Sequence, residues 1–233
     1  MNILQISTEV LDTLQNVSTS IENQATSMSA FELATKGGWI MIVLLILLAL
    51  SIYVLIERTL VIRKARQEDA TFMNRIKDYI HEGKVDAALG LCRKTDTPAA
   101  RMVEKGISRI GRPTTDVTSA VENVGNIEIA ILERGLPILA TTAAGAPMIG
   151  FLGTVTGMVK AFMSMAGEGA NVDVTSLSTG IYEALVTTVA GLVVGIIAMF
   201  AYNYLTTLIK GVINKMEMRI MEFMDILNEP AAS

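Results

Sequence analysis

A stretch of 36 residues, from 174 to 209, contains a single charged side chain, the carboxylate of Glu183. A hydrocarbon layer of about 30 Å is crossed by about 20 helical residues, so this stretch is long enough for a transmembrane helix with extra turns at its ends. An ionised carboxylate at the centre of such a helix costs about 2.5–3.5 kcal/mol. We therefore expect a membrane protein in which Glu183 has a specific role.

Two other stretches are long and uncharged. Residues 37–56 form a run of 20 residues with Trp39 and Tyr53 near its ends, and residues 135–159 form a run of 25. Aromatic residues are enriched where a helix meets the membrane interface. Together with residues 174–209, these runs predict an all-α, polytopic membrane protein with three transmembrane helices.

The charges flanking the first span predict its orientation. Only Lys36 precedes the span closely, whereas four basic residues follow it within ten positions. Because cytoplasmic flanks are enriched in Lys and Arg, the N-terminus is predicted to be periplasmic and the C-terminus cytoplasmic. The predicted organisation is an outer amphipathic N-terminal helix (1–36), a first span (37–56), a cytoplasmic helical domain (57–134), a second span (135–160), an outer connection (161–173), a third transmembrane helix (174–209) and a cytoplasmic C-terminal helix (210–233).

Small residues recur at intervals of three and four along the second and third spans. Such faces let membrane helices approach one another closely. Thr154 is the only hydroxyl residue on this face of the second span, while Glu183 borders the face of the third span near Thr187 and Thr188. A closed homo-oligomer would bring these faces to a shared axis. The predicted pore-facing small residues are Ala143, Pro147, Gly150, Gly157, Gly191 and Gly195.

A carboxyl group buried at that axis could hold and release protons, with the hydroxyls of Thr154, Thr187 and Thr188 as a short relay. Two simpler interpretations remain open. Glu183 could mark only the outer edge of the third span, since residues 183–202 already rise about 28 Å. A threonine in a span often does no more than donate to a carbonyl of its own helix.

The composition excludes several function classes. The chain has one Cys and one His, so it lacks the residues for a zinc cluster or a cysteine–histidine dyad, and neither an enzyme activity nor a cofactor is predicted. A net charge of −4 gives no basic surface for nucleic acid. The mean hydropathy of +0.47 is that of a membrane protein with large hydrated parts.

Three segments carry distinctive motifs. Ile56-Glu57-Arg58 ends the first span, residues 146–162 read APMIGFLGTVTGMVKAF, and residues 180–203 read GIYEALVTTVAGLVVGIIAMFAYN. The last two segments lie about 30 residues apart. In these segments the chain resembles the ExbB/TolQ/MotA proton-channel subunits of bacterial inner membranes. The second segment is similar to the family's AP-hydrophobic-GLLGTV-x-G pattern and the third to its GI-x-EAL-x-x-T-x-GL segment, in the family's order.

The resemblance implies roles and partners. Glu183 corresponds to the essential acidic residue of ExbB-like subunits, and Thr154 and Thr188 correspond to the two threonines that line the pore beside it. The implied assembly is a homopentamer in the inner-membrane lipid, around two helices of an ExbD-like single-span partner. Its implied function is to use the protonmotive force to drive a TonB-like protein in outer-membrane transport. A TolQ-like role in envelope maintenance and a passive scaffold for partner helices are the alternatives.

Overall fold

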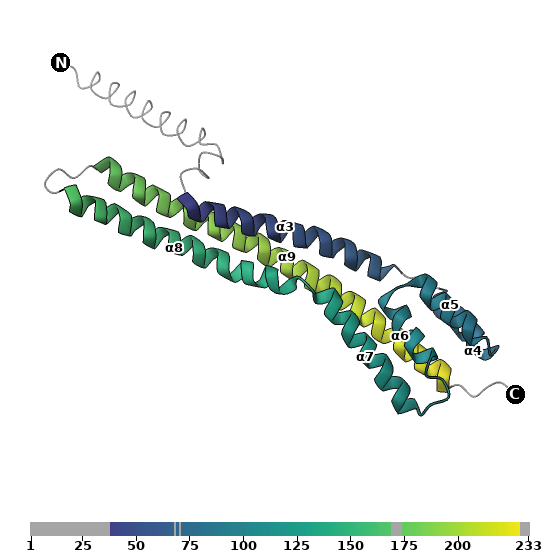
Figure 1. Cartoon of the computed structure of the whole chain (residues 1–233). Helices are drawn as coiled ribbons and strands as arrows, with labels where there is room; N and C mark the ends of the chain where they lie inside the picture. The colour runs from purple at the N-terminus through teal and green to yellow at the C-terminus, as the bar shows by residue number, and fades with distance from the viewer. Residues whose placement is uncertain (1–37, 68, 70, 169–173, 229–233) are drawn as a thin grey trace, which may run out of the picture. The chain divides into compact units, whose positions relative to one another are not determined.

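The computed structural model describes residues 38–67, 69, 71–168 and 174–228, and Figure 1 labels the helices that they form. The amphipathic helix predicted for residues 1–36 lies outside this part. Within the described part there is no strand, which confirms the predicted all-α class. The helices are α3 (Gly38–Arg66), α4 (Phe72–His81), α5 (Val85–Thr95), α6 (Pro98–Ile107), α7 (Thr114–Glu133), α8 (Leu136–Glu168) and α9 (Val174–Asn228).

Three of these helices are long and apolar enough to cross a membrane. They are α3, residues 136–166 of α8 and residues 178–228 of α9. Large apolar side chains such as Trp39, Phe151 and Phe200 are about two-thirds exposed on them, as expected for surfaces that face lipid. This confirms the three predicted spans. With 55 residues, α9 is about 80 Å long and extends well beyond a hydrocarbon layer of about 30 Å.

The chain divides into two compact units. The first unit contains Met1–Ile46 and Ala146–Val193, and the second contains Leu47–Gly145 and Val194–Ser233. In the first unit, α8 and α9 run antiparallel and in direct contact, as Figure 1 also shows. This contact carries the residues of the candidate site.

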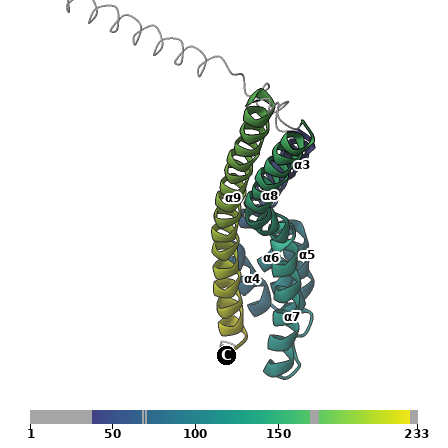
Figure 2. The same cartoon turned by 90° about the vertical axis from the view of Figure 1, so that its left-hand side faces the viewer.

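The second unit has a continuous hydrophobic core. Figure 2 shows α4–α7 gathered beside the C-terminal half of α9. Apolar residues of α9 recur there at intervals of three, four and seven, so that one face of the helix is buried. The largest fully buried side chains of this core include Phe72, Ile76, Val103, Val121, Leu205 and Phe223.

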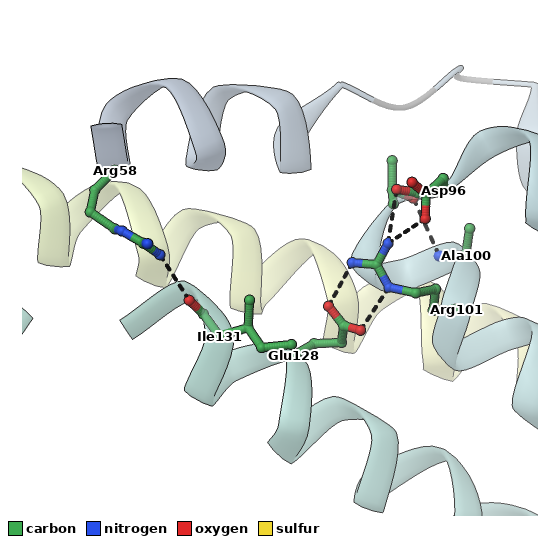
Figure 3. A network of polar contacts seen from close by, with 7 residues as sticks. Arg58, Asp96, Ala100, Arg101, Glu128 and Ile131 are labelled. Atoms are coloured by element: carbon green, nitrogen blue, oxygen red, sulfur yellow. Dashed lines mark hydrogen bonds and ion pairs between the residues drawn. The ribbon is translucent and has the colours of Figure 1, made fainter. Parts of the chain in front are cut away.

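A partly buried ion-pair network connects the C-terminus of α5 with α6 and α7 (Figure 3). Arg101 donates to both carboxylate oxygens of Glu128, at 2.7 Å each, and to Oδ1 of Asp96 at 2.6 Å. The Glu128 side chain is only 7% exposed. Its hydrogen bond to Arg101 raises the pKa of the guanidinium, so Arg101 stays charged. Loss of Arg101 would leave the buried carboxylate of Glu128 unpaired, which would lower the free energy of unfolding by about 3 kcal/mol.

A second arginine joins the end of α7 to α3. Arg58 is 8% exposed and donates from Nη1 to the carbonyl oxygen of Ile131 at 3.1 Å, in the last turn of α7 (Figure 3). A cation at this position balances the negative end of the helix dipole. Two residues after the end of α7, Gly135 adopts a φ of 94°, which other residues rarely reach, and α8 begins at the next residue.

Candidate functional site

The site is built around a close contact between the backbones of α8 and α9. A methyl group on Gly150 would lie 2.7 Å from the carbonyl oxygen of Thr187, and one on Gly191 would lie 2.6 Å from the carbonyl oxygen of Ala146. Both distances are shorter than any van der Waals contact of carbon with oxygen. Only glycine at these two positions allows the helices to approach so closely. We refer to this contact as the α8–α9 seam.

Several predicted pore-facing residues lie within the seam of a single chain. Gly150, Gly157 and Gly191 are buried there, and a methyl group on Gly157 would lie 3.1 Å from the carbonyl oxygen of Gly180. In the second unit, Gly195 is buried and Ala143 is half-buried, and Pro147 in the first unit is also half-buried. The small face of each helix thus serves first to pack the chain against itself.

Gly153 also belongs to the seam, although the sequence analysis did not single it out. The side chain of Thr187 occupies the space where a methyl group on Gly153 would lie. The signal was present in the sequence, because Gly150, Gly153 and Gly157 follow the same three-and-four spacing as the other small residues.

The three candidate threonines all donate to backbone carbonyl groups. Thr187 is 1% exposed and donates to Ala184 O at 2.8 Å. Thr188 donates across the seam to Gly150 O at 3.1 Å, and Thr154 donates to Phe151 O at 2.6 Å. The half-buried hydroxyl oxygens of Thr154 and Thr188 keep lone pairs with which they can accept a further hydrogen bond, whereas Thr187 is enclosed in the seam.

The carboxylate of Glu183 packs against the start of α3. A methyl group on Gly38 would lie 2.5 Å from Oε1 of Glu183, and Gly38 has a φ of +64°. The first turn of a helix exposes unpaired N–H groups and the positive end of its dipole, which suits an anionic oxygen. The side chain of Glu183 is half-buried, and within the described residues it has no hydrogen bond or ion pair.

Glu183 and Thr188 lie on opposite edges of the seam. They are five residues apart, which corresponds to about 140° around a helix. Thr154 lies one helical turn from Gly150, whose carbonyl accepts the hydrogen bond of Thr188. Within one chain, therefore, the structure brings Thr154 and Thr188 to one edge and Glu183 to the other, next to α3.

The position of Gly38 leads to a first prediction. Gly38→Ala would place a methyl group where Oε1 of Glu183 now lies, so we expect the carboxyl group to move away from α3. The displaced carboxyl group should react several-fold faster than that of the unmodified chain with dicyclohexylcarbodiimide, a hydrophobic reagent that modifies protonated carboxyl groups. Mass spectrometry of the peptide that contains Glu183 would measure the rate of modification.

Gly83→Ala is the matched control. Gly83 has a φ of +73°, so an alanine there suffers the same backbone strain as at position 38, but no atom lies within 4 Å of the added methyl group. We expect this variant to label at the rate of the unmodified chain. Equal rates for the two variants would show that the space above Gly38 does not position Glu183.

Comparison with known proteins places these residues in a family. Residues 94–218, which include Thr154, Glu183 and Thr188, match the MotA/TolQ/ExbB proton channel family. The chain is 30% identical over 194 residues to an ExbB homolog of Methanothermobacter thermautotrophicus, an alignment that covers 82% of this chain and 67% of the relative. It is 30% identical over 208 residues to the Tol-Pal system protein TolQ of Haemophilus influenzae, with 82% and 90% of the two chains covered.

A third relative is the biopolymer transport protein ExbB of Neisseria meningitidis, with 27% identity over 178 residues that cover 70% of this chain and 79% of the relative. The family match thus includes α6–α8 and α9 as far as Met218, and the relatives include ExbB and TolQ proteins alike. This chain, a multi-pass membrane protein, belongs to the MotA/TolQ/ExbB proton channel family.

Proposed function

We propose that the chain is the proton-conducting subunit of an inner-membrane complex that uses the protonmotive force to energise TonB-dependent transport across the outer membrane. Glu183 is the proton carrier in this proposal. The observation that supports it most strongly is the isolation of this carboxylate: it is the only charged side chain in residues 174–209, it is half-buried, and it has no hydrogen bond or ion pair within the described residues. Ionisable groups in such positions typically belong to ion pathways.

The two edges of the seam supply the rest of the pathway when copies of the chain form a ring. In a closed ring with a single type of interface, one edge of each copy faces the other edge of the next copy. The Glu183 edge of one copy then faces the Thr154 and Thr188 edge of its neighbour. The hydroxyl oxygens there can accept a hydrogen bond from water or from a protonated carboxyl group. We propose five copies in the ring.

A partner completes the transducer. The proposed partner is a dimer of an ExbD-like single-span protein whose intramembrane aspartate exchanges protons with Glu183. Each proton that crosses the membrane delivers about 2.3 kcal/mol per 100 mV, and this energy would drive movement of the partner helices and, through them, of a TonB-like protein. The four basic residues after the first span support a periplasmic N-terminus and a cytoplasmic C-terminus.

Cross-linking between copies tests the ring arrangement. Two differently tagged chains, one with Glu183→Cys and one with Thr188→Cys, would be produced together and treated with a short bifunctional thiol reagent. We expect a cross-linked dimer that carries both tags. The native Cys92 does not interfere, because burial raises the pKa of its thiol to about 12 and keeps it protonated.

Val189→Cys serves as the control partner for Glu183→Cys. Val189 is next to Thr188 but is 61% exposed, and it lies on the side of α9 that faces away from the α8–α9 seam. We expect little cross-linking for this pair. If the Glu183 and Thr188 pair gives no more dimer than the control pair, the proposed ring is wrong.

A TolQ-like function is the second candidate, in which the complex energises a TolA-like protein for envelope maintenance. The alignment with TolQ of Haemophilus influenzae favours it, since 90% of that protein is covered. Complementation distinguishes the ExbB-like function from the TolQ-like function. The gene would be introduced with its neighbouring partner gene into strains that lack either ExbB and ExbD or TolQ and TolR. Restored growth on iron complexes supports the first function, and restored detergent resistance supports the second.

A further inference from the structure

An apolar groove with one basic end lies between α3 and α9 in the second unit. Its volume is about 590 Å³, within the range of small-molecule sites. Six of its nine lining residues are aliphatic or Phe, among them Ile56 and Leu60 of α3 and Ile197 and Phe200 of α9. The other three are Thr59, Arg63 and Tyr204, so the groove is lined by one cation and by no carboxylate.

Arg63 is the distinctive residue of this groove. Its side chain is exposed, and within the described part of the chain it forms no hydrogen bond or ion pair. The nearby Glu57 cannot neutralise it, because that carboxylate pairs with Arg58 at 2.7 Å. A guanidinium offers a planar set of N–H donors that fits phosphate oxygens. The groove thus has a free phosphate-binding group at one end and hydrocarbon-like walls along the rest.

The sequence places the groove at the level of a lipid headgroup. Ile56 is the last residue of the uncharged run of α3, and Arg63 follows it by about two turns. On α9, Tyr204 lies near the end of the uncharged stretch, which Lys210 closes. Tyrosine and arginine at such a boundary are typical of the membrane interface, and apolar walls extend from it toward the hydrocarbon layer.

We propose that this groove binds an anionic glycerophospholipid, with one acyl chain against Ile56, Leu60 and Phe200 and the phosphate on Arg63. Aliphatic side chains of both α3 and α9 line the groove, which suits an acyl chain. The charge selects an anionic headgroup, because a zwitterionic lipid brings a cation close to Arg63, Lys64 and Arg66. A second copy of the chain seated on the groove is the competing occupant, and the experiment below distinguishes the two.

Native mass spectrometry tests the proposal on the purified complex. The complex would be incorporated into vesicles with equal amounts of phosphatidylglycerol and phosphatidylcholine, extracted in mild detergent, and analysed for lipids that stay bound to the intact assembly. We expect phosphatidylglycerol to be retained in several-fold excess over phosphatidylcholine. Arg63→Gln should abolish this excess, while the mass of the assembly in the same spectra shows that the complex remains intact.

Lys64→Gln is the matched control, because Lys64 is also exposed and basic but does not line the groove. It should keep the excess of phosphatidylglycerol. An equal loss in both variants, or no loss in either, would overturn the proposal in favour of a general attraction between basic residues and anionic lipid. Efficient cross-linking of Leu60→Cys between copies, with no bound lipid, would also overturn it, since a second chain would then cover the groove.

Discussion

Glu183→Gln is expected to reduce proton flux through the complex by about 100-fold or more, while assembly is retained. Glutamine has nearly the same shape as glutamic acid, so packing against Gly38 at the start of α3 changes little. It cannot bind and release a proton, and no other charged side chain lies in residues 174–209 to replace it. Flux would be measured with a pH-sensitive dye in vesicles under an imposed potential.

Glu217→Gln is the control on the same helix. Glu217 is exposed and lies beyond the uncharged stretch of α9, so its substitution should leave proton flux unchanged. Full activity of the Glu183→Gln complex, either in vesicles or in growth that depends on outer-membrane transport, would refute the role of Glu183. The same result, combined with output that does not depend on the protonmotive force, would favour a passive scaffold.

Gly150→Ala is expected to destabilise the complex by about 1–3 kcal/mol. The added methyl group would lie 2.7 Å from the carbonyl oxygen of Thr187 and 3.1 Å from the α-carbon of Gly191. These are backbone atoms, which cannot rotate away as a side chain could. The helices must therefore separate, which also weakens the hydrogen bond from Thr188 to Gly150 O. Thermal denaturation of the purified complex would measure the loss.

Gly145→Ala, five residues earlier in α8, is not expected to destabilise the complex. No atom lies within 4 Å of a methyl group at this position. Alanine is a better helix former than glycine by up to about 1 kcal/mol, so this variant should be as stable as the unmodified complex or slightly more stable. If both variants shift the denaturation temperature in the same direction, close backbone contact at Gly150 is not what limits stability.

The three apolar helices could be predicted because hydropathy is a local property of the sequence. The same holds for the burial of one face of α9 beyond residue 205, which the spacing of its apolar residues encodes. The pairing of helices could not be obtained in this way. Small residues on α8 and α9 indicate a close contact, but they do not say whether the partner surface belongs to the same chain or to another copy.

The polar contacts depend most strongly on the tertiary structure. Arg101 and Glu128 are 27 residues apart in a segment where charges of both signs alternate, and nothing in the sequence distinguishes this pair from the others. The place of Glu183 beside Gly38 likewise depends on the approach of α3 to α9, across more than 140 residues of sequence. The roles of Glu183 and the three threonines in proton transfer remain predictions that the variants above address.

The hydrogen bonds of Thr154 and Thr188 bear on whether cations or anions could pass beside them. Because both half-buried hydroxyls donate their proton to a main-chain carbonyl, the groups that they present to a neighbouring molecule are oxygen lone pairs. Hydronium, sodium and water are compatible with such a lining, whereas chloride would meet lone pairs and a carboxylate without a single donor from these residues. A passage built in this way would reject anions without needing a positively charged filter.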